Sequence, residues 1–209
     1  LEQRSARQKQ TKDRVMDKRS ASDPFVSANE VELFLSDQID QRRAECLNAS
    51  RQHTLRHMIL NSNSLVERAN ADNYLESEND EQLLLFLPFK QKHHLRTVRF
   101  YAPNSENCPR TIRLFVNRPS MDFDSVETQK ADQEIVLKQS EASSNPVKPI
   151  ALKGLHFRNV QSLTVYIKDN HGAETTVIYK MKLVGSLAAD TSKQALKKVP
   201  VTGDTLDLY

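Results

Sequence analysis

Residues 157–168 read FRNVQSLTVYIK, a polar turn that leads into a run of strand-forming side chains. Within this run, Leu163, Val165 and Ile167 alternate with the more polar Thr164, Tyr166 and Lys168. Successive side chains of a β-strand point to opposite faces of a sheet, so this period of two predicts a strand with one buried and one wet face. The stretch therefore favours a β-sheet protein.

The same alternation recurs in other segments of the chain. Apolar residues hold the even positions of 112–116 and the odd positions of 177–183, and Val98-Arg99-Phe100 repeats the pattern. Pro, Asn, Ser or Gly residues occupy the intervals, as turns require. Many short strands without helical periodicity between them predict an all-β fold, an antiparallel sandwich or jelly roll.

Helices are expected to be few and short. Ser27 and Glu30 have the spacing of a capping box, which predicts a short helix or turn within 28–43. A second short helix is possible within Ser192–Lys198, whereas 139–149 (QSEASSNPVKP) predicts an exposed loop.

Charge divides the chain into a basic arm and a neutral body. Residues 1–20 contain seven Lys/Arg and three Asp/Glu, and the remaining 189 residues contain 23 basic and 24 acidic side chains. We therefore expect a basic flexible arm over 1–27, a folded domain over 28–186 and a C-terminal tail over 187–209. A body with almost no net charge argues against nucleic-acid binding.

Apolar runs and cysteines limit the cellular setting. The longest apolar run, Leu83–Phe89, is much shorter than the ~20 residues that span a bilayer, so no membrane contact is expected. The first 20 residues are charged and predict no signal peptide. Cys46 and Cys108 are the two cysteines, too few and too far apart for a disulfide framework. We expect a cytoplasmic location, with the nucleus as a second one.

Several phrases occur in an order that resembles a known family. They are LESENDEQLLL at 75–85, LFVNRPSMDF at 114–123 and FRNVQSLTVYIK at 157–168, with ECLN at 45–48 and NHGAETT at 170–176. Together they resemble the PITH domain, a module that follows thioredoxin in some proteasome-interacting thioredoxin-like proteins. The resemblance covers roughly 33–186 and implies a jelly roll of the galactose-binding type. A thioredoxin domain would belong to a longer parent chain.

The chain departs from the family at its cysteines. Positions that carry additional cysteines in family members correspond here to Ser64 and Asn79, so that only Cys46 remains. Cys46 follows the acidic Glu45, which disfavours a thiolate, although Arg42 and Arg43 lie close in sequence. We expect Cys46 to be a small buried apolar residue, Cys108 to lie exposed in a loop, and no redox activity.

By resemblance, the predicted function is a non-enzymatic interaction module that binds the proteasome regulatory particle. Arginine is favoured at protein interfaces. The apolar loop residues Met121 and Phe123 could either fill the end of the sandwich or anchor a partner, and we favour the first interpretation. For the basic residues, a solvated strand face without a partner is an equally good interpretation. For the acidic turn, a solvated turn is the favoured interpretation over a docking surface. The candidate partner-binding residues are Asp80, Glu81, Lys90, Lys92, Arg96, Arg110, Arg113, Arg118, Met121 and Phe123.

No catalytic, metal or cofactor site is expected. The four glycines form no phosphate-binding loop, and no nucleophile–base arrangement can be assigned. Adjacent His93 and His94 would point to opposite faces of a strand, and His53 and His57 would share a helix face without a further ligand.

The alternative function is that of a small polar ligand or carbohydrate-binding jelly roll, with the ligand at the loop ends. This argument rests on fold analogy alone. The absence of Trp and an aromatic content of 6% argue mildly against it.

Overall fold

The computed structural model describes residues 31–33, 35–62 and 73–188. The predicted arm, position 64 and the possible helix at 192–198 lie outside these ranges. In chain order, the elements are β1 (Val31–Leu33), α1 (Leu35–Gln38), β2 (Glu45–Leu47), α2 (Leu55–Ser62), β3 (Leu75–Glu76), β4 (Leu83–Tyr101), β5 (Pro109–Val116), α3 (Phe123–Thr128), β6 (Gln133–Val136), α4 (Gln139–Ser143), β7 (Ile150–Ala151), η1 (Leu155–Arg158), β8 (Val160–Asn170), β9 (Val177–Ile178) and β10 (Lys180–Leu187).

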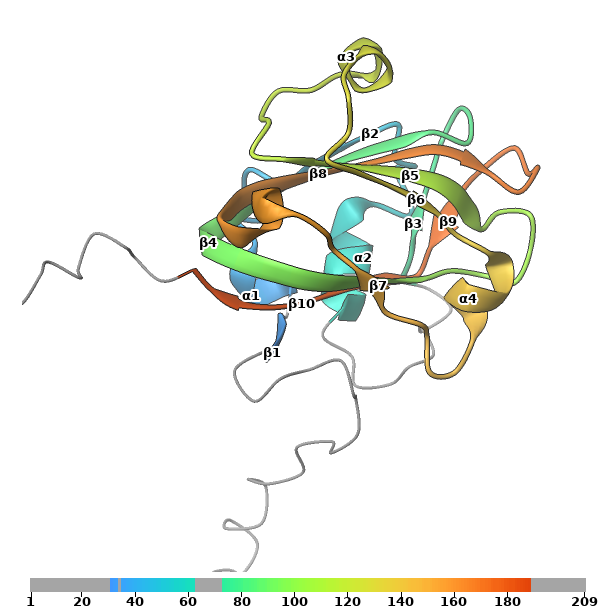
Figure 1. Ribbon diagram of the computed structural model, residues 1–209. Coiled ribbons are helices and arrows are strands. Elements are labelled where there is room, and N and C mark those ends of the chain that lie inside the picture. Colours follow the sequence, from blue (N-terminus) through green and yellow to red (C-terminus); the bar gives the residue numbers. More distant parts are fainter. Residues whose placement is uncertain (1–30, 34, 63–72, 189–209) are drawn as a thin grey trace, which may run out of the picture.

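The long strand β4 belongs to both layers of an antiparallel sandwich (Figure 1). Its first part pairs with β8 on one side and β2 on the other, and β5 and β6 extend this first layer beyond β8. From His93 onward β4 pairs with β10, which carries β1, and near its end with β7. Pro88 has no N–H to donate, and the register with β8 shifts between Pro88 and His93, where the strand changes layer.

The core lies between the two layers. On β5 and β8, the side chains of Ile112, Leu114, Val165 and Ile167 are all fully buried, as the alternation predicts. Full burial of each such side chain contributes about 1.5–3 kcal/mol through the hydrophobic effect. The all-β prediction is therefore confirmed, and the alternating residues identified from sequence do form its interior.

The outer face of the first layer is less exposed than the sequence predicts. Phe115 and Tyr166 should have pointed to solvent, yet both have 0% exposed surface. They form a second apolar cluster with Leu84 and Val126, and Val126 lies on α3, the helix above this face in Figure 1. The expectation of one wet face is wrong here because a helix outside the sheet covers it.

The segment 177–183 also differs from its prediction. It forms two strands, β9 and β10, that are separated at Tyr179. Lys180 was expected on a wet face but is fully buried, with its Nζ 5.1 Å from the centroid of the Tyr101 ring. A cation over an aromatic face gains electrostatic stabilisation that partly replaces its lost hydration.

The short helix predicted within 28–43 is present as the four-residue α1, and the described part of this range also contains strand β1, which pairs with β10. The Ser27–Glu30 capping box lies outside the described residues. Two other local expectations are corrected. The loop expected at 139–149 contains α4 and the buried side chains of Ala142 and Val147. Cys108 is fully buried rather than exposed, because its loop turns into the core at the start of β5.

Gly185 lies where β10 meets a bulge in β4. The register between the two strands shifts between Val184 and Gly185. A Cβ atom at Gly185 would collide with the carbonyl oxygen of His94 on β4. This close approach of two backbones needs a residue without a side chain.

Candidate functional site

The loop 117–122 and helix α3 cover the outer face of the first layer. Asp122 caps the helix: its Oδ1 accepts from the Ser125 N–H at 2.8 Å, and the Ser125 Oγ accepts from the Asp122 N–H at 2.9 Å. The hydrogen bond from the Ser125 N–H is the main reason why the pKa of the Asp122 carboxyl is lowered. Met121 and Phe123 pack against the second apolar cluster, with the Phe123 ring edge-on to Tyr166 at 6.1 Å. They were expected at the sandwich end, but the structure places them on a sheet face.

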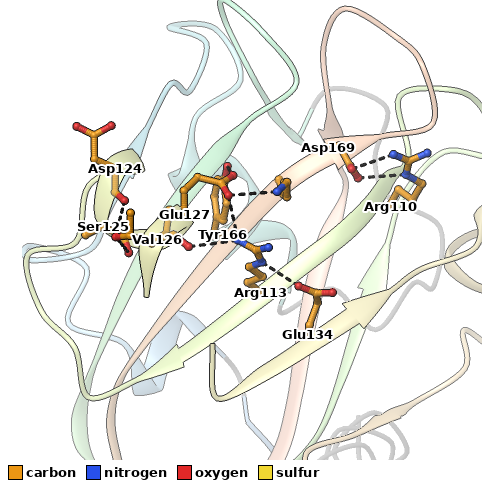
Figure 2. Close-up of polar contacts among 11 residues, drawn as sticks. Arg110, Arg113, Asp124, Ser125, Val126, Glu127, Glu134, Tyr166 and Asp169 are labelled. Carbon is orange, nitrogen blue, oxygen red and sulfur yellow. Dashed lines mark hydrogen bonds and ion pairs between the residues drawn. The ribbon is translucent and has the colours of Figure 1, made fainter. Parts of the chain in front are cut away.

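Glu127 of α3 joins the helix to the sheet through three polar contacts (Figure 2). Its carboxylate accepts from the Tyr166 hydroxyl at 2.7 Å, from Lys168 Nζ at 3.1 Å and from Arg113 at 3.1 Å. The hydrogen bond from Tyr166 is the main reason why the pKa of Glu127 is lowered. Burial and the same hydrogen bond raise the pKa of Tyr166. Both groups therefore keep their ordinary protonation states, and the contact holds α3 in place.

The three predicted arginines of the β5 region are engaged within the chain. Figure 2 shows Arg113 between Glu127 and Glu134, with 2.8 Å from its Nε to Glu134. Arg110 forms a two-point contact with Asp169, at 2.9 and 3.2 Å, also visible in Figure 2.

Arg118 lies over the Phe115 ring at 5.3 Å, donates to the Lys130 carbonyl at 2.9 Å and faces Asp132 at 3.4 Å. The basic side chains of this region therefore meet acidic partners inside the molecule. Their role in binding a partner stays a prediction.

Asp80 organises the turn before β4. The Asn48 amide donates to Asp80 Oδ1 and to the Gln82 carbonyl, both at 2.7 Å, and Gln82 N–H donates to the same Oδ1 at 2.9 Å. Asn48 has φ 62°, a left-handed conformation that Asn tolerates better than most residues. The carbonyl of Glu81 accepts from the Thr176 hydroxyl at 2.7 Å. The acidic turn thus has a structural role, and a docking role stays a prediction.

The remaining basic candidates lie elsewhere on β4. Lys90, Lys92 and Arg96 are exposed on the part of the strand that leads into the second layer. Lys90 Nζ donates to the Asp37 carbonyl at 2.8 Å, which connects β4 to α1. The predicted basic residues therefore lie on different elements, with Lys90, Lys92 and Arg96 on β4 and the three arginines on β5 and the loop that follows it.

A groove lies on the outer face of the first layer, and of the predicted partner-binding residues only Met121 is among the described residues that line it. It has a volume of about 300 Å³ and lies between the turn at 40–44, β2 and the loop 117–122. Met121 and Phe86 contribute apolar surface, and Leu47 beside them is 41% exposed.

Arg42 and Arg43 stand at the rim of this groove, and both are exposed. Within the ranges that the structure describes, neither guanidinium is held by an ion pair, in contrast to the arginines of β5. Among the described residues that line the groove, Glu45 is the only acidic one. The sequence signal was the Arg-Arg pair directly before a short strand, but only the fold brings it opposite Met121.

The cysteines and histidines do not form a reactive group. Burial raises the pKa of the Cys46 thiol and of the Cys108 thiol to about 12, and neither forms a disulfide. Cys46 is half-buried against the core. His93 is buried between the Gln91 carbonyl at 2.7 Å and Gln38 Oε1 at 3.1 Å, and burial lowers its pKa.

His53 does not share a helix face with His57, because α2 begins at Leu55. Its ring stacks on Tyr74 at 3.7 Å. Among the described residues, no three His, Cys, Asp or Glu side chains gather as metal ligands. In the same ranges, none of the helices has the length and apolar character that crossing a membrane requires.

A family model described as the PITH domain matches residues 26–201. Thioredoxin-like protein 1 of Schizosaccharomyces pombe is 32% identical over 165 residues, which cover 77% of this chain and 54% of the yeast protein. PITH domain-containing protein 1 of Xenopus laevis is 33% identical over 155 residues, covering 74% of this chain and 71% of the relative. The human protein of that name is 31% identical over 147 residues, covering 70% and 66%.

Solved structures agree on the fold. The family 32 carbohydrate-binding module of Clostridium perfringens NanJ, solved with galactose, superimposes with a TM-score of 0.51 over 74% of this chain and 98% of the module. Its sequence identity is 7%, so the likeness concerns the jelly-roll fold alone.

Proposed function

Because the chain belongs to the PITH domain family, we propose that it is a non-enzymatic interaction module that binds the proteasome regulatory particle as an adaptor or accessory factor. Its galactose-binding-like jelly roll is a fold that carries unrelated functions, so the proposal depends on the site. The chain spans 54% of the yeast relative named for thioredoxin, and a thioredoxin domain in a longer parent chain is part of the proposal. We propose that it acts in the cytoplasm, with the nucleus as a second location.

The groove beside Arg42 and Arg43 is the observation that carries this proposal. It combines two arginines without acidic partners in the described part of the chain with apolar surface from Leu47, Phe86 and Met121. Arginine and apolar anchors are enriched where proteins bind one another. The fitting partner is an acidic segment that also offers an apolar side chain.

The groove is formed before the partner arrives. One wall is β2, hydrogen-bonded to β4. The other contains Met121, which is held next to a capped helix that Glu127 attaches to the sheet. Preorganised walls reduce the conformational entropy lost on binding.

The other candidate residues take secondary roles in this proposal. Arg113 and Arg118 maintain the wall that carries Met121 through their contacts with α3 and the segment after it. The acidic turn at 80–81 and the exposed basic residues of β4 would add contacts at the rim of a larger interface. The basic arm over 1–27 would add long-range attraction, an effect that salt weakens.

Retention of purified regulatory particle by the immobilised chain, at low and high salt, tests the proposal. We expect saturable binding that weakens with salt and is reduced by Arg42→Glu. The matched control is Arg158→Glu, which reverses the same charge on an exposed residue of η1. Absence of retention at either salt concentration would contradict the adaptor function, and equal losses for both variants would exclude the groove.

A further inference from the structure

A second and larger cavity lies near the far end of β4. It has a volume of about 680 Å³ and is formed by the loop after β4, by α4 with the loop that follows it, and by the β9–β10 junction. Phe86 lines the groove described above, whereas Tyr101 at the end of the same strand lines this cleft. The two sites are therefore separate.

The cleft gathers aromatic rings in a chain that has few. Tyr74, Tyr101 and Tyr179 line it, three of the five tyrosines of the chain. The rings of Tyr74 and Tyr179 stand edge to face at 6.4 Å and 88°. His53 stacks on Tyr74 at 3.7 Å and so limits the rotation of that ring.

The described residues that line the cleft carry no formal charge. None of these fourteen residues is Asp, Glu, Lys, Arg or His, although 27% of the chain is charged. A charged ligand would lose its hydration there without gaining an opposite charge, which is costly. The ligand that fits this lining is therefore uncharged.

Several polar groups of the cleft are left for a ligand. The amide of Asn107 already donates to the Thr175 carbonyl at 2.9 Å. In contrast, the exposed amides of Asn104 and Asn145 and the hydroxyl of Tyr179 make no hydrogen bond within the described ranges. An amide both donates and accepts, so it can bind a ligand hydroxyl in either sense.

From this lining we propose that the cleft binds a neutral, hydroxyl-rich small molecule with the chemistry of an uncharged mono- or disaccharide. Such a ligand has C–H faces that pack on aromatic rings and hydroxyls that match the free amides. The volume lies within the range of about 300–1,000 Å³ that is usual for small-ligand sites. This binding is independent of the proposed adaptor function, because it uses different residues.

Backbone NMR shifts of the whole chain measure this binding directly. The probes are galactose, glucose, N-acetylglucosamine, lactose and maltose, with glucose 6-phosphate as the charged counterpart. A proline-rich peptide serves as the alternative ligand, since such peptides also bind aromatic-lined grooves. We expect at least one neutral sugar to shift amides of 102–107 and 142–147, and the phosphorylated sugar to bind more weakly.

Two variants assign the binding to the cleft. Asn104→Ala, at an exposed position, should weaken sugar binding about tenfold, the loss expected when a ligand hydroxyl loses its partner. Tyr179→Phe keeps the ring and should have a similar effect through its hydroxyl. Ser120→Ala, in the other groove, is the control and should change nothing. The proposal is overturned if no neutral sugar shifts these amides at saturating concentration, if Asn104→Ala leaves binding unchanged, or if only the peptide binds.

Discussion

The contact between Glu127 and Tyr166 should make α3 part of the cooperative fold. Tyr166 is fully buried, and its hydroxyl donates to Glu127 at 2.7 Å. Glu127→Ala removes this acceptor. A buried donor left without an acceptor costs about 1–3 kcal/mol. The contacts of Glu127 with Lys168 and Arg113 are partly exposed, and such pairs contribute below about 1 kcal/mol each.

We therefore expect Glu127→Ala to lower the free energy of unfolding by about 2–3 kcal/mol. For a domain of this size, the melting temperature should fall by roughly 4–12 °C. Tyr166→Phe removes the hydroxyl itself, so no buried donor is left without an acceptor. It should lower the free energy of unfolding by about 1 kcal/mol. The double variant should then reveal a coupling energy of about 1–2 kcal/mol between the two side chains.

Urea unfolding of the four proteins gives these energies, and the α3 resonances in NMR show whether the helix detaches. Glu174→Ala, at an exposed position, is the matched control and should change stability little. A coupling energy near zero, or equal effects of Glu127→Ala and Glu174→Ala, would refute the reasoning. Loosening of α3 should also weaken partner binding, because Met121 lies directly before the helix.

The remaining predictions concern acid, packing and thiols. Hydrogen bonds lower the pKa of Glu127 below its ordinary 4.5, and those from Arg110 and Thr111 outweigh burial to lower the pKa of Asp169 below 3.8. The stabilisation from these two carboxylates is fully present above their ordinary pKa values and is lost as the pH falls through their lower pKa values in the folded state. Urea unfolding should therefore show stability that declines below about pH 4. A stability that does not change with pH in this range would contradict the prediction. Gly185→Ala should destabilise the fold by about 1–3 kcal/mol in the same assay, since its Cβ meets the His94 carbonyl, and unchanged stability would show that β4 can move aside. Both thiols have a pKa of about 12 and should react slowly with a disulfide reagent at pH 8 until urea unfolds the chain, whereas rapid reaction of the folded protein would identify an accessible thiolate.

Local patterns in the sequence were sufficient for the fold class. The alternation at Leu163, Val165 and Ile167 is a property of neighbouring residues, and any strand that buries one face must show it. The ordered phrases around it placed the chain in its family. The fold class and the family are both confirmed, because the alternation and each of the phrases are formed by residues that are close together in the chain.

The candidate site depended on contacts that local patterns do not encode. Nothing near Arg113 in sequence indicates that Glu127 and Glu134 will accept from it, so its charge looked available. The three tyrosines of the cleft are likewise far apart in the chain. The low aromatic content of the sequence therefore gave no indication that they line one cleft.

The sequence by itself determined an all-β domain of the PITH family, with alternating strands that build its interior. Only the tertiary structure decided that β4 serves both layers, that α3 buries Tyr166, that Lys180 lies over Tyr101, and that Arg42 stands opposite Met121. The physical reason is that strand formation follows from the side chains of adjacent residues. Burial, ion pairing and grooves follow from which distant elements pack together.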